Sequence, residues 1–432
     1  MNAPAQLPLG ERRRGIWINV AAVLTFCALT VLILNPIFRS LAALAFLAFG
    51  SLLIVSKPRA SLDVILRYWY LMILPAYCLV SVLWSQFPSI TLRHGLQLAI
   101  TFVIAIVIAN RVSPASLFRY LFGIYGIGVI GSLMFGHVRD DIGAWVGIFG
   151  SKNAFAAVVS AFILTSLAVL IDKTAPRLMR LAAVPGLIVS GPLLLLAQST
   201  GAIIVMIPAV AMALLIHFSR RFSKVQRICL GTLIGLGGTI GIILLSTYGD
   251  ALFAGLLDYS GKDTTLTGRT DLWDFGKYII GQHPVLGVGY QAFWVQGYNP
   301  AEGLWADFGI QERRGFNFHN TYINNAVEIG VLGLGLQIAM LYGAFIGSIF
   351  WAFRNPSPTS AFYCSFLTMV IGGSFVEVAV FFQFSVTSVL VICALVYTLQ
   401  ANAAWKAWAA SLAAQRAMWP PAAMHPAPHH RF

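Results

Sequence analysis

The sequence predicts an all-α polytopic membrane protein with about 12 transmembrane helices. Hydrophobic residues make up 58% of the 432 residues and charged residues only 10%, whereas a soluble domain has roughly 25% charged residues. Near-continuous apolar runs of about 17–25 residues recur along the chain, which is the length of a helix that crosses a bilayer. The alternating ten-residue segments of an outer-membrane β-barrel are absent.

Nine predicted spans precede a long polar loop and three follow it. A short N-terminal segment, residues 1–15, leads into spans 1–9 within residues 16–247, the loop covers residues 248–328, and spans 10–12 occupy residues 329–405. The spans are expected at about 16–34, 40–56, 66–84, 94–110, 116–135, 153–171, 181–197, 200–218, 227–247, 329–353, 361–381 and 385–405. The tail, residues 406–432, ends in a segment rich in Pro, Ala and His, and we expect it to be disordered.

The distribution of positive charge orients the bundle. Most of the 28 Lys and Arg residues fall in the N-terminal segment, the tail and the short loops on the same side as them. Because short loops rich in Lys and Arg face the cytoplasm, both termini are predicted to be cytoplasmic and the long loop to lie outside. The net charge of +13 therefore reflects topology. No nucleic-acid-binding motif accompanies it, so nucleic acid is not expected as a partner.

The long loop has its own predicted elements. The sequence DLWDFGKYIIG (271–281) has apolar residues at helical spacing, which predicts an amphipathic helix along the membrane surface. Pro284, Gly287 and Gly289 then mark a turn. We expect a short helix to begin near Asn320 and to break at Gly330 before the next span.

Two residues of this loop are candidates for chemistry. Arg269 precedes the predicted surface helix, where its guanidinium could bind a phosphate at the helix N-terminus. The alternative is an interfacial Arg paired with Asp271 or Asp274. His319 lies just outside a span, and a neutral imidazole there could take a proton from a sugar hydroxyl near neutral pH. The alternative is a hydrogen-bonded interfacial His.

Further candidates lie at the predicted outer face. Lys152 and Asn153 open the sixth span and could bind phosphate or sugar, although a Lys that extends to the interface is the commoner case. Trp273 could stack on a sugar or belong to the ordinary aromatic belt. The remaining ionisable candidates are Arg93, Arg313, Arg314 and Glu328. A transporter would instead need polar groups within its spans, and these spans are poor in charge; Glu377 is one of the few ionisable residues that could lie in one.

Four motifs together resemble the O-antigen ligase / Wzy-type polymerase superfamily, and its exopolysaccharide polymerases most closely. They are GIFGSKNAFA (147–156), LLAQSTGA (195–202), TGRTDLWDFGKYIIGQHPVLGVGYQAFW (267–294) and HNTYINNAVEIGVLGLG (319–335), in the order and spacing of the family. The resemblance implies a GT-C-like inverting glycosyltransferase of the bacterial inner membrane. It would polymerise undecaprenyl-pyrophosphate-linked repeat units at the periplasmic face without a metal or cofactor.

The resemblance also implies roles for residues. Arg269 would hold the pyrophosphate, and His319 would orient or deprotonate the attacking hydroxyl. The other residues expected to contact substrate are Lys152, Asn153, Arg93, Ser199, Asn320, Trp273, Arg313, Arg314 and Glu328. Many ligases have an arginine where this chain has Thr200, and Lys152, Arg93, Arg313 or Arg314 could supply that charge.

The acceptor separates the remaining alternatives. A ligase would transfer the glycan to lipid A-core or to a protein, and a flippase would only move it. Expected partners are the lipid-linked donor and acceptor, membrane lipid, and the co-polymerase and flippase proteins that such pathways usually contain. No P-loop, nucleophile elbow, HExxH motif or dinucleotide fingerprint occurs in the sequence.

Overall fold

The computed structural model describes residues 19–140, 142–223, 264–313 and 315–418, and a few residues between 225 and 240. The predicted segment 1–15, most of the predicted span 227–247, residues 248–263 of the long loop, Arg314 and the last residues of the tail lie outside this part of the chain. Over the described part the fold is helical, with a single two-stranded antiparallel sheet.

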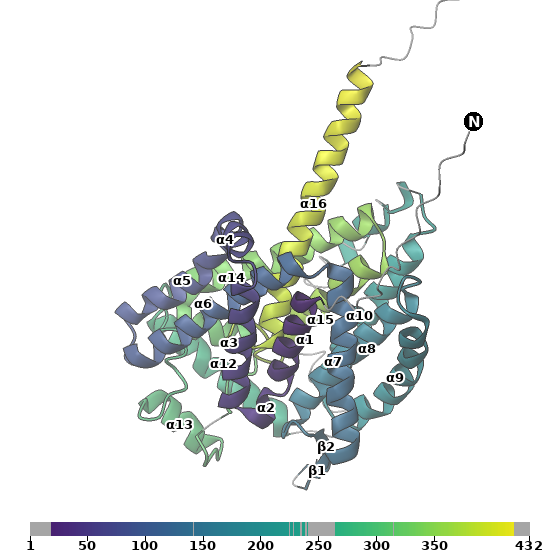
Figure 1. Cartoon of the computed structure of the whole chain (residues 1–432). Coiled ribbons are helices and arrows are strands. Elements are labelled where there is room, and N and C mark those ends of the chain that lie inside the picture. Colours follow the sequence, from purple (N-terminus) through teal and green to yellow (C-terminus); the bar gives the residue numbers. More distant parts are fainter. Residues whose placement is uncertain are drawn as a thin grey trace, which may run out of the picture.

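The first half of the chain contributes a series of helices and one hairpin (Figure 1). These elements are α1 (Val20–Ile33), α2 (Asn35–Phe38), α3 (Ser40–Val55), α4 (Pro58–Arg67), η1 (Trp69–Met72), α5 (Ile73–Val80), η2 (Ser81–Leu83), α6 (Pro88–Arg111), α7 (Pro114–Phe135), β1 (His137–Arg139), β2 (Ala144–Gly147), α8 (Lys152–Ile171), α9 (Arg177–Leu196) and α10 (Thr200–Ser219). The second half contributes α12 (Thr264–Gln282), α13 (Asn299–Asp307), α14 (Thr321–Arg354), α15 (Pro358–Ser374) and α16 (Val386–Met418).

The described helices make this a multi-pass membrane protein. Seven of them (α6, α7, α8, α9, α10, α14 and α16) are long and apolar enough to cross a bilayer, and α3 with α4 would make an eighth, although the two are bent by 100°. Some predicted spans correspond to shorter helices: α1 has 14 residues, which is about 21 Å at 1.5 Å per residue, against a core of about 30 Å. Hydropathy shows that a segment is apolar but not where its helix begins and ends. The count of twelve spans therefore stays a prediction.

The core of the bundle lies around α6, α15 and α16. The run Ile104–Ala109 of α6 is buried, as is Val389–Val396 of α16. At one end of these helices Tyr397 donates a hydrogen bond to the Val112 carbonyl at 2.7 Å, and Tyr363 donates to the Pro114 carbonyl at 3.0 Å. These bonds cap the loop between α6 and α7.

An ion pair holds the loop that follows α8. Arg119 of α7 donates to the carboxylate of Asp172 at 2.6 Å, and Thr174 donates to the same carboxylate at 2.8 Å. Burial opposes the negative charge, but the hydrogen bonds from Arg119 and Thr174 outweigh it and lower the pKa of Asp172. The pair therefore stabilises the folded chain whenever the carboxylate is ionised.

A second apolar cluster forms from the long loop. Leu272 and Ile279 of α12 pack with Phe293, Trp305 and Phe318, so the predicted amphipathic helix is confirmed as the major part of α12. Figure 1 shows α13 and the β1–β2 hairpin at one end of the bundle, and α4 with the C-terminal half of α16 at the other. The long loop thus builds a packed cap on one end of the bundle.

The helix predicted near Asn320 is confirmed as the beginning of α14. The Asn320 side chain accepts hydrogen bonds from the backbone N–H groups of Tyr322 and Ile323, at 2.9 and 3.1 Å. The predicted break occurs at Gly330, whose φ of 62° is left-handed. A Cβ at Gly330 would lie 2.2 Å from the Val285 carbonyl oxygen, so the turn at 283–289 packs directly on this break.

Residues 406–418 correct the prediction of a disordered tail, because α16 continues to Met418. The segment is rich in Ala, which has the highest helix propensity. Its base is fixed by Arg354, which donates to Asn402 at 2.8 Å and lies 4.0 Å from the ring centre of Trp405. Beyond these contacts the helix projects from the bundle (Figure 1).

Candidate functional site

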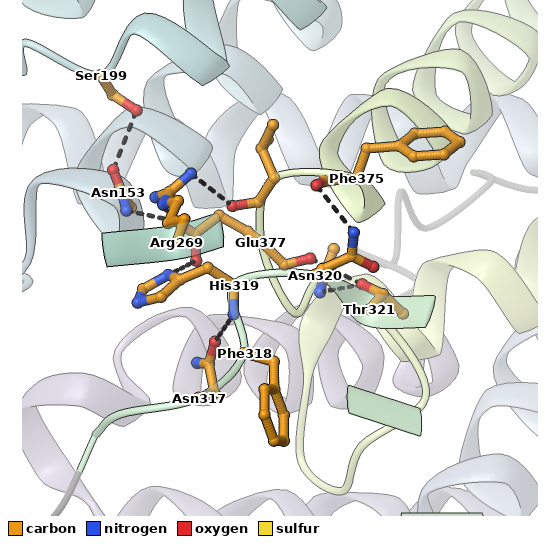
Figure 2. Close-up of polar contacts among 12 residues, drawn as sticks. Asn153, Ser199, Arg269, Asn317, Phe318, His319, Asn320, Thr321, Phe375 and Glu377 are labelled. Carbon is orange, nitrogen blue, oxygen red and sulfur yellow. Dashed lines mark hydrogen bonds and ion pairs between the residues drawn. The ribbon is translucent and has the colours of Figure 1, made fainter. Parts of the chain in front are cut away.

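One carboxylate, that of Glu377, joins three separate parts of the chain (Figure 2). Its Oε1 accepts a hydrogen bond from Asn153 Nδ2 of α8 and lies 3.4 Å from Arg269 Nη2 of α12. Its Oε2 lies 3.0 Å from His319 Nδ1, just before α14. Glu377 itself belongs to the loop between α15 and α16, residues 375–385, which we name the Glu377 loop.

The backbone of this loop is held beside its carboxylate. Thr321 Oγ1 donates to the Glu377 carbonyl at 2.8 Å and accepts from the Ala379 N–H at 2.9 Å. Asn320 Nδ2 donates to the Phe375 carbonyl at 3.3 Å. The first residues of α14 therefore fix both the loop and the histidine that faces it.

Asn153 is oriented at both ends of its amide. Its Oδ1 accepts a hydrogen bond from Ser199 Oγ at 3.1 Å, and its Nδ2 donates to Glu377. Ser199 precedes α10 but makes no side-chain cap to that helix, because its hydroxyl is turned toward Asn153. Ser199 therefore does not cap the first backbone N–H groups of α10, and a helix N-terminus without such a cap favours an anion.

His319 is held in a strained but well-supported position. Its φ is 47°, and its backbone N–H donates to Asn317 Oδ1 at 2.7 Å. Trp273 Nε1 donates to the neighbouring Phe318 carbonyl at 2.8 Å. A carboxylate beside Nδ1 keeps the proton on that nitrogen and leaves the lone pair of Nε2 available as a base. The side chain is 24% exposed, so a substrate can reach it.

Arg269 differs from its predicted setting. Helix α12 begins at Thr264, so Arg269 lies within the helix and a phosphate site at the helix N-terminus is wrong for this residue. The alternative pairing with Asp271 or Asp274 is not found among the described residues either: Arg269 has its ion pair with Glu377, and Asp274 pairs with Lys277 at 2.8 Å. Arg269 instead uses Nη2 toward Glu377 and Nη1 toward the Val376 carbonyl, at 3.4 and 3.3 Å. A guanidinium has five donors, so others remain for an anion.

The structure thus gathers Arg269, His319, Asn153, Ser199 and Asn320 around one loop (Figure 2). Trp273 supports the backbone next to His319 through its indole N–H. Lys152 is the first residue of α8, beside Asn153. These predicted residues form, or adjoin, one site.

Three other predicted residues make contacts elsewhere. Arg313 forms an exposed ion pair with Glu302 at 3.2 Å. Glu328 is buried, and its Oε2 accepts from the Gln291 N–H at 3.0 Å, which locks the turn to α14. It is therefore a structural residue, not one that is open to substrate. Arg93 is exposed on α6 next to His94, and Arg314 lies outside the described residues.

Sequence reasoning missed Glu377 as a site residue. It assigned Glu377 to a span over 361–381, whereas α15 ends at Ser374 and the carboxylate lies in the loop. One signal was available: Glu377 is the only acidic residue after Glu328 in the sequence. Within the described part of the chain, no group of three or more His, Cys, Asp or Glu side chains is arranged to hold a metal ion.

Comparisons with known proteins match this region. The family model Wzy_C, described as O-antigen ligase, matches residues 185–338, a range that includes Ser199, Arg269 and His319. A relative, the exopolysaccharide production protein ExoQ of Rhizobium meliloti (strain 1021), is 30% identical over 317 residues. The similarity covers 72% of this chain and 72% of that protein.

Proposed function

The chain belongs to the O-antigen ligase family, and on that premise we propose that it polymerises undecaprenyl-pyrophosphate-linked repeat units of an exopolysaccharide. The similarity to an exopolysaccharide production protein supports polymerisation over ligation. The observation that carries the chemistry is the His319–Glu377 pair beside Arg269. A base, its orienting carboxylate and an anion-binding guanidinium are the groups that glycosyl transfer from a pyrophosphate requires.

The reaction uses His319 as the base. Nε2 takes the proton of the acceptor hydroxyl while that oxygen attacks the anomeric carbon of the donor glycan. The bond between the anomeric carbon and the pyrophosphate oxygen breaks, its electron pair leaves with the pyrophosphate, and the anomeric configuration inverts. Glu377 keeps Nδ1 protonated before the step and stabilises the imidazolium that forms. The proton then passes from the imidazolium to the released pyrophosphate or to water.

Arg269 stabilises the leaving group. Charge builds up on the pyrophosphate as the bond breaks, and donors already in place stabilise it without reorganisation. The N-terminus of α10 lies next to the same loop, since a Cβ added at Gly201 would be only 3.2 Å from a methyl group of Val376. Its backbone N–H groups, which Ser199 does not cap, therefore add hydrogen-bond donors for the pyrophosphate. These groups compensate for the arginine that Thr200 replaces.

The proposal also covers place and partners. It retains the GT-C-like architecture, the bacterial inner membrane, cytoplasmic termini and a periplasmic long loop. The position of the cap at the end opposite α4 supports this topology (Figure 1), because basic residues follow α3 at that end. Co-polymerase and flippase proteins remain the expected protein partners, and neither metal nor cofactor enters the proposed reaction.

A deletion strain tests the function. We expect loss of secreted high-molecular-weight polysaccharide while the lipopolysaccharide banding pattern stays intact. If the polymer instead accumulates on its lipid carrier and lipid A-core lacks its glycan, the protein is a ligase. If neither the secreted polysaccharide nor the lipopolysaccharide changes, the transporter becomes the better assignment.

Site variants test the chemistry in the same strain. Arg269→Ala is expected to abolish polymer, and His319→Ala to reduce its rate of formation by about 10²–10⁴-fold. Lys277→Ala is the control, because it removes an exposed charge of α12 that pairs with Asp274 and not with Glu377 within the described part of the chain. If Arg269→Ala makes near-normal amounts of polymer at a normal protein level, Arg269 is not part of the catalytic site.

A further inference from the structure

A second hydrogen-bond chain ends on the Glu377 loop. Arg93 Nη2 lies 3.2 Å from His94 Nε2, and His94 Nδ1 lies 2.7 Å from the side-chain amide of Gln383. The Tyr290 hydroxyl lies 3.1 Å from the same amide and donates to the Phe381 carbonyl at 3.2 Å. This chain connects an exposed arginine of α6 to the far end of the loop that carries Glu377.

The proton positions in this chain follow from its first member. A guanidinium can only donate, so His94 Nε2 accepts and the proton of the neutral imidazole is on Nδ1. The Gln383 amide is placed with Nε2 toward Nδ1 and Oε1 toward the Tyr290 hydroxyl. Two N–H groups cannot share a hydrogen bond, so we assign this amide the other way round, with its oxygen accepting from Nδ1. Arg93 is therefore oriented by a neutral acceptor, and its positive charge is not cancelled.

Arg93 differs in this respect from other cations at this end of the molecule. Arg269 pairs with Glu377, and Lys277 with Asp274, whereas Arg93 forms no ion pair within the described part of the chain. Its side chain is exposed. An oriented, uncompensated guanidinium is suited to a phosphate group, which it can bind through two parallel hydrogen bonds.

The separation from Glu377 suits a second substrate. In the proposed polymerisation the acceptor is itself a lipid-linked glycan, and its attacking hydroxyl is at the opposite end of the glycan from its pyrophosphate. The two pyrophosphates must therefore bind apart. Gln383 follows Glu377 by six residues, which span at most about 20 Å. Through His94 and Gln383, Arg93 is therefore connected to the same loop at a different residue from the one that faces His319.

We propose that Arg93, oriented by His94 and Gln383, binds the pyrophosphate of the acceptor glycan. The inference rests on the proposed polymerase function and extends it to the second substrate. The phosphate of a bulk phospholipid headgroup has the same chemistry as this ligand, so the test must separate the two sources.

The test uses the full-length protein in nanodiscs of a zwitterionic lipid. The donor is an isotopically labelled lipid-pyrophosphate glycan whose own attacking hydroxyl is methylated. Two acceptors carry the same glycan, one on lipid pyrophosphate and one on an uncharged alkyl chain. We expect Arg93→Gln to raise KM for the pyrophosphate acceptor by about tenfold to a hundredfold, and to leave kcat and the KM for the alkyl acceptor unchanged.

Lys277→Gln, which removes an exposed cation with a carboxylate partner, should change neither KM. An equal rise of KM for both acceptors, or no rise, would overturn the proposal. A loss that appears only when anionic phospholipid is added would also overturn it, because Arg93 would then bind bulk lipid. If the wild-type protein forms no glycosidic bond with either acceptor, the polymerase function itself fails, which is a separate result.

Discussion

Replacing Glu377 by Gln tests the role of its charge with little change of shape. The carboxylate accepts through Oε1 from Asn153 and Arg269, and through Oε2 from His319. A carboxamide has only one oxygen. Asn153 and Arg269 both donate at the Oε1 position, whereas His319 alone donates at the Oε2 position. We therefore expect the oxygen to stay with Asn153 and Arg269, and the new NH2 group to face His319 Nδ1.

That arrangement reverses the imidazole tautomer. Nδ1 would have to accept from the NH2 group, so the proton would move to Nε2, which is the atom that must take the proton of the hydroxyl. In serine proteases the corresponding change from carboxylate to carboxamide costs about 10⁴ in kcat for this reason. Glu377→Gln should therefore cost nearly as much as His319→Ala.

The lost charge gives an independent magnitude. Unit charges at the 3.0 Å between Oε2 and Nδ1 attract by about 1.4 kcal/mol in water and about 5.5 kcal/mol at an effective dielectric constant of 20. Because the His319 and Glu377 side chains are 24% and 30% exposed, the effect lies between these limits, which correspond to about 10-fold and 10⁴-fold in rate.

The assay is the initial rate of glycan transfer by purified variants at saturating lipid-linked substrate. We expect Glu377→Gln to lower kcat by at least about 10², and the double variant with His319→Ala to be no slower than the slower single variant. A loss below about tenfold in Glu377→Gln, or fully additive losses, would refute the orienting role of the carboxylate.

Three further substitutions separate stability from catalysis. Gly330→Ala puts a Cβ at positive φ against the Val285 carbonyl, so thermal unfolding should show a loss of at least about 1–3 kcal/mol. Trp273→Phe loses the hydrogen bond to the Phe318 carbonyl and should lower kcat by about threefold to tenfold at unchanged KM; an unchanged kcat would show that this bond does not position the histidine. Asp172→Asn should cost about 1.5–3 kcal/mol of stability near neutral pH at unchanged kcat. Because the folded pKa of Asp172 is lowered, this difference should be complete above about pH 4 and disappear as the pH falls through the folded pKa, which unfolding curves against pH would check.

Local signals in the sequence located much of the site but not its centre. The N-cap at Asn320, the break at Gly330 and the helix around Trp273 follow from capping, glycine and periodicity, which act within a few residues. The start of α12 at Thr264 was not predicted, because the polar residues before Arg269 carry no apolar period. The site was therefore predicted as separate residues, whereas its assembly depends on contacts between distant elements.

Glu377 shows why hydropathy conceals such a centre. The sequence around it is apolar on both sides, so a sliding window assigns it to a span, yet the chain leaves helical geometry there, with Phe381 and Phe384 at positive φ. Irregular backbone at such a position needs polar partners. Thr321 and Ser388 supply them, through the Glu377 carbonyl, the Ala379 N–H and the Phe381 N–H.

The same break lets one loop serve two substrates. A helix continued from α15 through residue 383 would point Glu377 and Gln383 in directions fixed by its 3.6-residue turn, whereas the loop directs Glu377 to His319 and Gln383 to His94. Arg269 and Arg93 then stand at opposite ends of a single connection between α15 and α16. If the acceptor pyrophosphate binds at Arg93, substitutions at Gln383 should act on the acceptor KM, whereas substitutions at Glu377 should act on kcat. A variant of Gln383 that lowers kcat alone would contradict this division of the loop.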